Sequence, residues 1–184
     1  MKRALGWLLL AATAFGATWA TTDESTTARG SIASRLLGPV RTVASNVQWV
    51  RFDLARRQGE YELAYARAET ALRLDPASSA GWLLLSHHLA FDRGGPGAGT
   101  REDRATWFRA GLEILERGKP FVRLPEELEF TQGTYLVAQA SYAPEDVVWP
   151  GGARAALEAA AEHFRRAGKP EFAESALELI EETD

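Results

Sequence analysis

The stretch from Gly59 to Leu89, GEYELAYARAETALRLDPASSAGWLLLSHHL, decides the fold class of this chain. Its apolar and small residues recur at spacings of three and four, which is the period of an amphipathic helix. Asp75-Pro76 interrupts the pattern, because the residue before a proline is disfavoured in helical geometry. The stretch therefore predicts two helices, one from about Glu60 to Leu74 and one from about Ser78 to Asp92.

The helical period continues on the N-terminal side of this stretch. A helix is predicted to open at Pro39 and to end at Gly59, since proline suits a first helical position and glycine suits a C-terminal one. Its apolar face consists of Val40, Val43, Val47, Val50 and Leu54, with Ile32 and Leu36 continuing the stripe backwards. The β-branched residues would also suit a strand, but their spacing is not two.

Four more helices are predicted on the C-terminal side, and no convincing alternating strand pattern is present. Thr100 and Asp103 resemble a capping box that opens the first of them. The four helices run from Thr100 to about Gly118, onward from Pro125, from about Ala153 to Ala167, and onward from Pro170. The fold class is therefore all-α, with about seven helices.

Within the opening stretch, glycine, small residues and proline stand at fixed intervals. Glycine allows a tight turn between paired helices, alanines allow close helix approach, and proline closes the unit. The residues are Gly59, Glu60, Tyr61, Ala64, Ala71, Leu72, Leu74, Asp75 and Pro76, followed by Trp82, Leu85 and Ser86. This pattern resembles the tetratricopeptide repeat, and a weaker match recurs around Gly168. The resemblance implies a right-handed α-α superhelix of about three helix pairs over residues 36–184.

The resemblance also implies a concave groove, lined mostly by the first helix of each pair, that binds protein partners. The family's groove positions fall on Trp49, Asp53, Arg56 and Arg57 in the first pair and on His87 and Phe91 in the second. Trp149, in a Trp-Pro-Gly-Gly loop, is a further candidate for an exposed aromatic contact. Core packing stays open as the alternative for Trp49 and Phe91.

The N-terminus carries a targeting signal. Lys2 and Arg3 precede 19 uncharged residues, which as a helix would extend about 28 Å and match the hydrocarbon core of a bilayer. We predict a signal anchor over residues 1–22, a polar linker over 23–35, and a cleaved signal peptide as the alternative. The expected membrane residues are Trp7, Leu8, Leu9, Leu10, Phe15 and Trp19. Either way, the rest of the chain is expected on the periplasmic side of a bacterial inner membrane, with a cytoplasmic N-terminus and, for the anchor, a single pass.

Composition excludes several classes of site. The chain has no cysteine, so disulfides, thiolate metal sites and a cysteine-linked lipid anchor are excluded. A net charge of −4 argues against nucleic-acid binding. The charge is unevenly placed, with six arginines and one acid over residues 29–57, and six acids and no base over 171–184. Such runs are ordinary on solvated faces, but the basic end is also suited to anionic lipids or an acidic partner.

Residues that could carry metal or enzyme chemistry are sparse. His87 and His88 point about 100° apart on a helix and cannot chelate one metal together. His88 and Asp92 are four residues apart, but His163 is the only other histidine. The loop from Arg93 to Thr100 lacks the lysine of a phosphate loop, and no hydrolase, zincin or dinucleotide motif occurs. We therefore expect no metal, no cofactor and no enzymatic activity.

The sequence as a whole predicts a non-enzymatic scaffold, tethered to the membrane by its N-terminal helix. Its expected partners are other proteins of a larger membrane complex, because helical repeats offer broad surfaces rather than reactive pockets. A periplasmic peptide- or glycan-binding module, released by signal-peptide cleavage, is the main alternative. A third possibility is an envelope enzyme with an unrecognised all-α site.

Overall fold

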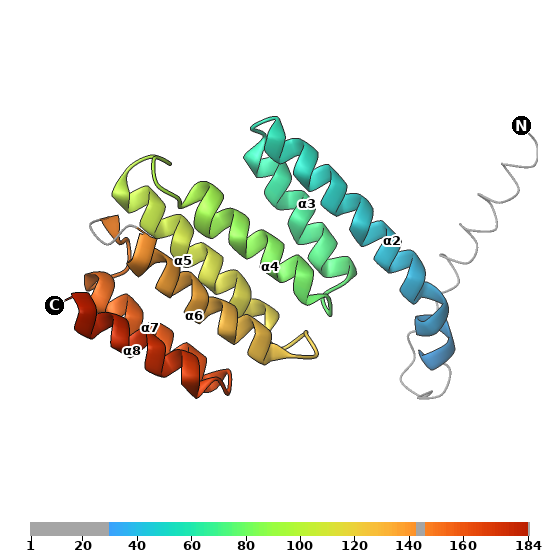
Figure 1. The fold of residues 1–184 in the computed structure, drawn as a ribbon. Helices are drawn as coiled ribbons and strands as arrows, with labels where there is room; N and C mark the ends of the chain where they lie inside the picture. Colours follow the sequence, from blue (N-terminus) through green and yellow to red (C-terminus); the bar gives the residue numbers. More distant parts are fainter. Residues whose placement is uncertain (1–29, 143–145, 184) are drawn as a thin grey trace, which may run out of the picture. The chain divides into compact units, whose positions relative to one another are not determined.

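The computed structural model describes residues 30–142 and 146–183, and within them the chain is all-α (Figure 1). The predicted signal anchor, with Trp7 to Trp19, lies outside these residues. The chain divides into two compact units, residues 1–40 and 41–184. Among the described residues, no helix combines the length and the hydrophobicity needed to cross a bilayer.

Seven α-helices and one π-helical segment occur in the described residues, and all seven helices predicted from the sequence are among them. Their bounds are α2 Gly30–Arg57, α3 Tyr61–Leu74, α4 Ser79–His87, η1 His88–Arg93, α5 Arg101–Gly118, α6 Pro125–Tyr142, α7 Gly152–Arg166 and α8 Pro170–Thr183. α2 begins well before the predicted start, within the expected linker, and contains Pro39. The helix predicted from Ser78 to Asp92 changes to π geometry at His88.

Two local signals in the sequence explain where helices begin and end. Gly59 has a φ of +77°, a conformation that L side chains rarely adopt, so glycine suits the turn from α2 into α3. At α5 the predicted capping box is confirmed, because the Asp103 backbone N–H donates to the Thr100 hydroxyl and the Thr100 backbone N–H donates to the Asp103 carboxylate. The box satisfies two N–H groups that the helix geometry leaves free.

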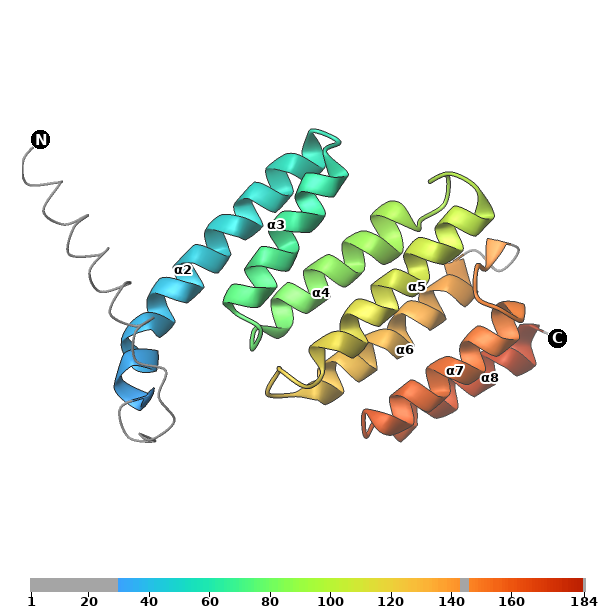
Figure 2. The same cartoon turned by 180° about the vertical axis from the view of Figure 1, so that it is seen from behind.

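Helices α3 to α8 each pack against the next helix in the sequence, and α4 also contacts α6 (Figures 1 and 2). This order is that of a helical-repeat-like array. Glycines allow the closest crossings: a Cβ on Gly111 would come within 2.8 Å of the Ser86 carbonyl, and one on Gly133 within 2.8 Å of the Phe164 ring. One continuous apolar cluster links α2 to α8 through these crossings.

Helix α2 has two apolar faces, and the array covers only one of them. Phe52 and Ala55 are buried, and the buried Ser45 hydroxyl donates to the Ala71 carbonyl of α3 at 3.0 Å. The predicted apolar face is the uncovered one, with Val43 62%, Val47 44%, Val50 71% and Leu54 55% exposed. At about 100° per residue, the two faces are centred roughly 180° apart.

Candidate functional site

A groove of about 410 Å³ lies between the C-terminal half of α2 and the α4–η1 segment. Its lining residues are Phe52, Asp53, Arg56, Leu84, His87, His88 and Asp92. Three residues predicted to bind a partner, Asp53, Arg56 and His87, are among them. The lining residues of each helix lie together because positions three or four apart share one face of a helix.

The polar rim of the groove is held together by ion pairs that cross from α2 to η1. The Arg56 guanidinium donates to Asp53 Oδ1 at 2.9 Å and to Asp92 Oδ2 at 3.1 Å. Arg57 Nε lies 2.8 Å from Asp53 Oδ2, and His88 Nδ1 lies 2.9 Å from Asp92 Oδ2. Hydrogen bonds from the two arginines lower the pKa of Asp53. The rim is thus ordered, and it is still open to solvent.

Aromatic side chains extend this surface from α4 and η1 towards α6. The rings of His87 and Phe91 are 5.2 Å apart, and Phe91 stands edge-on to Tyr135 at 4.8 Å. Phe91 also packs against Phe108 of α5, and the Tyr135 hydroxyl lies 3.2 Å from that of Ser86. Phe91 is therefore a half-buried packing residue, while His87 is exposed and lines the groove.

The two predicted tryptophans lie elsewhere. Trp49 is edge-on to Phe52 at 5.5 Å, and its ring lies so close to Gly81 that a Cβ there would come within 2.9 Å. Trp149 is half-buried and packs against the main apolar cluster. Neither lines the groove. Arg57 lies at its rim, where it pairs with Asp53 without lining the cavity.

A second pocket, of about 420 Å³, was not predicted from the sequence. It is lined by Tyr61, Glu62, Tyr65, His88, Leu89, Arg93 and Trp107. The Arg93 guanidinium lies 4.1 Å from the Tyr61 ring centroid and 4.8 Å from that of Trp107. The aromatic residues of α3 and α5 are visible in the sequence, but only the fold shows that they lie on either side of Arg93. Because Arg93 already takes up the two ring faces, this pocket is less open to a new ligand than the groove.

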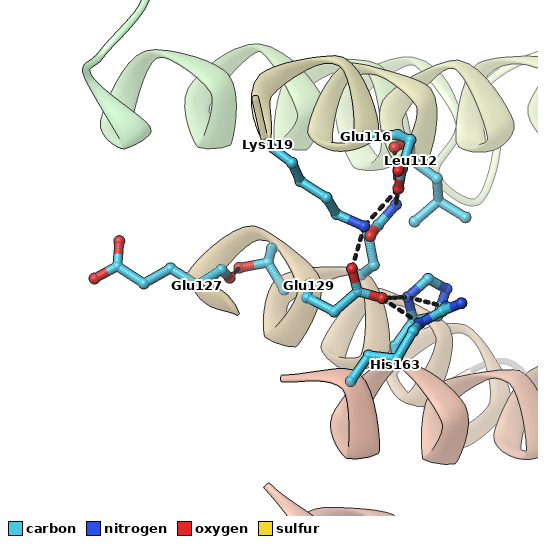
Figure 3. A network of polar contacts seen from close by, with 9 residues as sticks. Leu112, Glu116, Lys119, Glu127, Glu129 and His163 are labelled. Carbon is cyan, nitrogen blue, oxygen red and sulfur yellow. Dashed lines mark hydrogen bonds and ion pairs between the residues drawn. The ribbon is translucent and has the colours of Figure 1, made fainter. Parts of the chain in front are cut away.

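A polar cluster that joins three successive elements was also missed (Figure 3). Glu129 of α6 accepts from Arg166 Nε of α7 at 2.7 Å, its Oε1 lies 2.7 Å from His163 Nδ1, and its Oε2 contacts the Lys119 ammonium. Burial alone would raise the pKa of Glu129, but hydrogen bonds from Lys119 and His163 outweigh it and lower that pKa. Burial lowers the pKa of His163.

This cluster joins helices to one another and does not form a ligand-binding or catalytic site. Both Glu129 oxygens are already paired, and none of the pockets described above includes the cluster. The buried Gln132 beside it donates to the Leu112 carbonyl at 3.2 Å, while its Oε1 has no hydrogen-bond partner. Side-chain pairs between distant residues also occur elsewhere in the molecule, for example between Arg117 and Glu69, which are 48 residues apart.

The described residues contain no group of three or more His, Cys, Asp or Glu side chains placed to hold a metal ion. The candidate pair His88 and Asp92 forms a hydrogen bond instead, and Asp92 also pairs with Arg56. His163 belongs to the Glu129 cluster.

Comparison of the chain with protein-family models, with curated proteins and with solved structures finds no match.

Proposed function

We propose that this chain is a non-enzymatic scaffold of the tetratricopeptide type that holds a protein partner in the α2–α4 groove. The observation that carries the proposal is the groove itself, which combines an apolar floor with an ordered, exposed rim of charges. Protein interfaces use this combination, because apolar burial supplies affinity and paired rim charges supply orientation and specificity.

The lining residues suggest what such a partner presents. Leu84 is 47% exposed and offers an apolar contact above the buried Phe52 ring. The Arg57 side chain is 71% exposed, so it can pair with an incoming carboxylate while Arg56 keeps Asp53 in place. A segment with an apolar side chain and an acidic side chain near it fits this arrangement.

We further propose that the scaffold belongs to a membrane complex on the periplasmic side of a bacterial inner membrane. The support is the uncharged N-terminal segment behind Lys2 and Arg3, together with the arginine excess over residues 29–57. On this proposal the N-terminal helix tethers the chain, and its partners are other proteins of the same complex.

The groove is tested by co-purification of the full chain, tagged at its C-terminus, from membranes in a mild detergent. We expect Leu84→Glu to lose the partner that the wild-type chain retains, because an acid would replace the apolar floor contact. Leu124→Glu is the matched control, since Leu124 is 43% exposed and does not line the groove. A wild-type chain that always runs alone, or a Leu84→Glu chain that keeps every partner, would contradict the proposal.

Localisation is tested separately, by protease treatment of intact and of permeabilised cells. The C-terminal domain should be protected in intact cells and cut once the outer barrier is permeabilised, since the proposal places it in the periplasm. A cytoplasmic C-terminus would contradict the tether. A mature N-terminus near Thr21 would instead support the released peptide- or glycan-binding module.

A further inference from the structure

Helix α2 carries an apolar stripe that no other described helix covers. The stripe consists of Val43, Val47, Val50 and Leu54, which are 44–71% exposed. It faces away from the buried side of α2, where Ser45 and Phe52 meet the array. A helix that is apolar on two opposite faces is suited to a position between two layers of protein. The described residues supply the layer on one face only.

The spacing of the stripe indicates what kind of layer fits it. Its residues alternate intervals of four and three, which is the a/d pattern of a two-helix seam. In the sequence the same alternation runs back through Val40 and Leu36, and α2 is 28 residues long, or four heptads. We propose that a second copy of this chain covers the stripe, through a two-fold contact between the α2 helices.

We place the two helices parallel and in register. The orientation, though not the contact, rests on the N-terminal tether proposed above, because two tethered copies would carry their membrane ends on the same side. In a parallel pair, the side chain flanking the seam at one position meets the residue five positions away on the other copy. Arg51 then meets Asn46 of the second copy, and Asp53 meets Gln58, so no like charges face each other along the stripe.

The charges also account for where the seam stops. The next a/d position after Leu54 is Arg57, and two arginines facing each other would repel. Arg57 instead turns to its own Asp53, at 2.8 Å. Four apolar side chains from each copy bury less surface than the roughly 1,200 Å² of total buried area that is typical of stable complexes. The dimer is therefore weak, and its population depends on the protein concentration.

The contact is tested by measuring the mass of the full chain in mild detergent, by light scattering after gel filtration. The wild-type chain is expected at twice its own mass, and Val50→Glu at its own mass, because charges at a seam position repel each other across the two-fold axis. Helicity should not change, since Val50 is 71% exposed. Leu177→Glu, at an exposed leucine of α8, is the matched control and should stay dimeric.

A wild-type chain that is monomeric at the highest soluble concentration would overturn the contact, and so would a Val50→Glu chain that stays dimeric. Retention of other proteins by the groove is read out separately, by Leu84→Glu, so the two proposals fail independently.

The register is tested by disulfide trapping, which is clean because the chain has no cysteine of its own. Val50→Cys should form a disulfide-linked dimer on mild oxidation, because equivalent seam positions face each other in a parallel pair. Glu113→Cys, on the exposed side of α5, should form no disulfide-linked dimer under the same conditions. A Val50→Cys chain that dimerises without cross-linking, or equal cross-linking of both variants, would overturn the parallel seam.

Discussion

The first and last helices of the described array, α2 and α8, differ in the polarity of the surface that they expose. The outer face of α2 is apolar, with Val50 71% exposed. Helix α8 buries Ala173, Ala176 and Ile180. Its exposed positions include Glu171, Glu174 and Glu178, together with the partly exposed Phe172 and Leu177. Helical arrays need end helices with polar outer faces to stay soluble. Helix α8 meets that need more fully than α2, whose exposed apolar residues form one stripe, and α2 is therefore the end where we expect another chain to bind.

The charged groups of the two ends differ in how far they are exposed to solvent. At the α2 end, Asp53 and Arg56 form ion pairs at a solvent-exposed rim. In the C-terminal half, the Glu129 side chain is 10% exposed and is held by groups from α7 and from the end of α5. Exposed pairs contribute little to stability, whereas removing one member of a buried cluster is costly. The C-terminal half is thus fixed by its charges, and the α2 end is left free to exchange contacts.

The largest expected effect separates the two faces of α2. Phe52→Ala removes a ring that is 1% exposed and should lower the free energy of unfolding by about 3–5 kcal/mol. Val50→Thr, two residues away on the stripe, should change it by less than about 0.5 kcal/mol. Urea unfolding at a protein concentration low enough to exclude dimers measures both. Equal losses would mean that the stripe belongs to the core.

The next effect tests whether the C-terminal half depends on its buried carboxylate. Glu129→Gln removes the anion that pairs with Arg166 and His163, while Lys119 keeps its pair with Glu116. We expect a loss of about 2–3 kcal/mol in the free energy of unfolding, because Arg166 is half-exposed and the cluster is not fully buried. Glu127→Gln is the matched control on the same helix, since its exposed carboxylate points away from the cluster (Figure 3). Similar unfolding curves for the two variants would remove the distinction between the ends.

Much of the helical framework could be predicted from the sequence, because its signals are local. The capping box at Thr100, the glycine turn at Gly59 and the opening of α6 at Pro125 each depend on neighbouring residues. The helical spacing of the apolar residues in α2 was also predicted correctly. That spacing does not determine which of the two apolar faces of α2 the array covers, since this depends on where α2 lies in the fold.

The site was predicted less completely, for two physical reasons. Asp53, Arg56 and His87, which the tetratricopeptide resemblance implied as groove residues, do line one groove, whereas Trp49 has a large ring that packs close to Gly81. Contacts between distant residues left no local signal. The Glu129–His163 pair spans 34 residues and follows only from the packing of α6 on α7.

A smaller effect concerns pH, and it again belongs to the C-terminal half. The pKa of His163 is lowered in the folded chain, by burial and by the nearby Arg166 and Lys119, although Glu129 opposes the shift. The unfolded chain therefore binds more protons, and stability should fall as the pH drops below about 6.5 towards the folded pKa. The lowered pKa of Glu129 adds a further loss of stability only below about pH 4.3.

The urea midpoint, measured between about pH 6.5 and pH 4.3, should depend less on pH in His163→Gln than in the wild-type chain.

The smallest effect is expected at the groove rim, and it tests whether the α2 end is free to exchange its contacts. Arg56→Gln removes the links to both Asp53 and Asp92, yet its side chain and theirs are each more than a third exposed. Water can replace such pairs, so the urea midpoint should not change beyond experimental error. Partner retention should fall all the same, because the rim loses the residue that orders it. A clear loss of stability would mean that rim charges hold α2 in place, and the two ends would then differ in exposure but not in how they are stabilised.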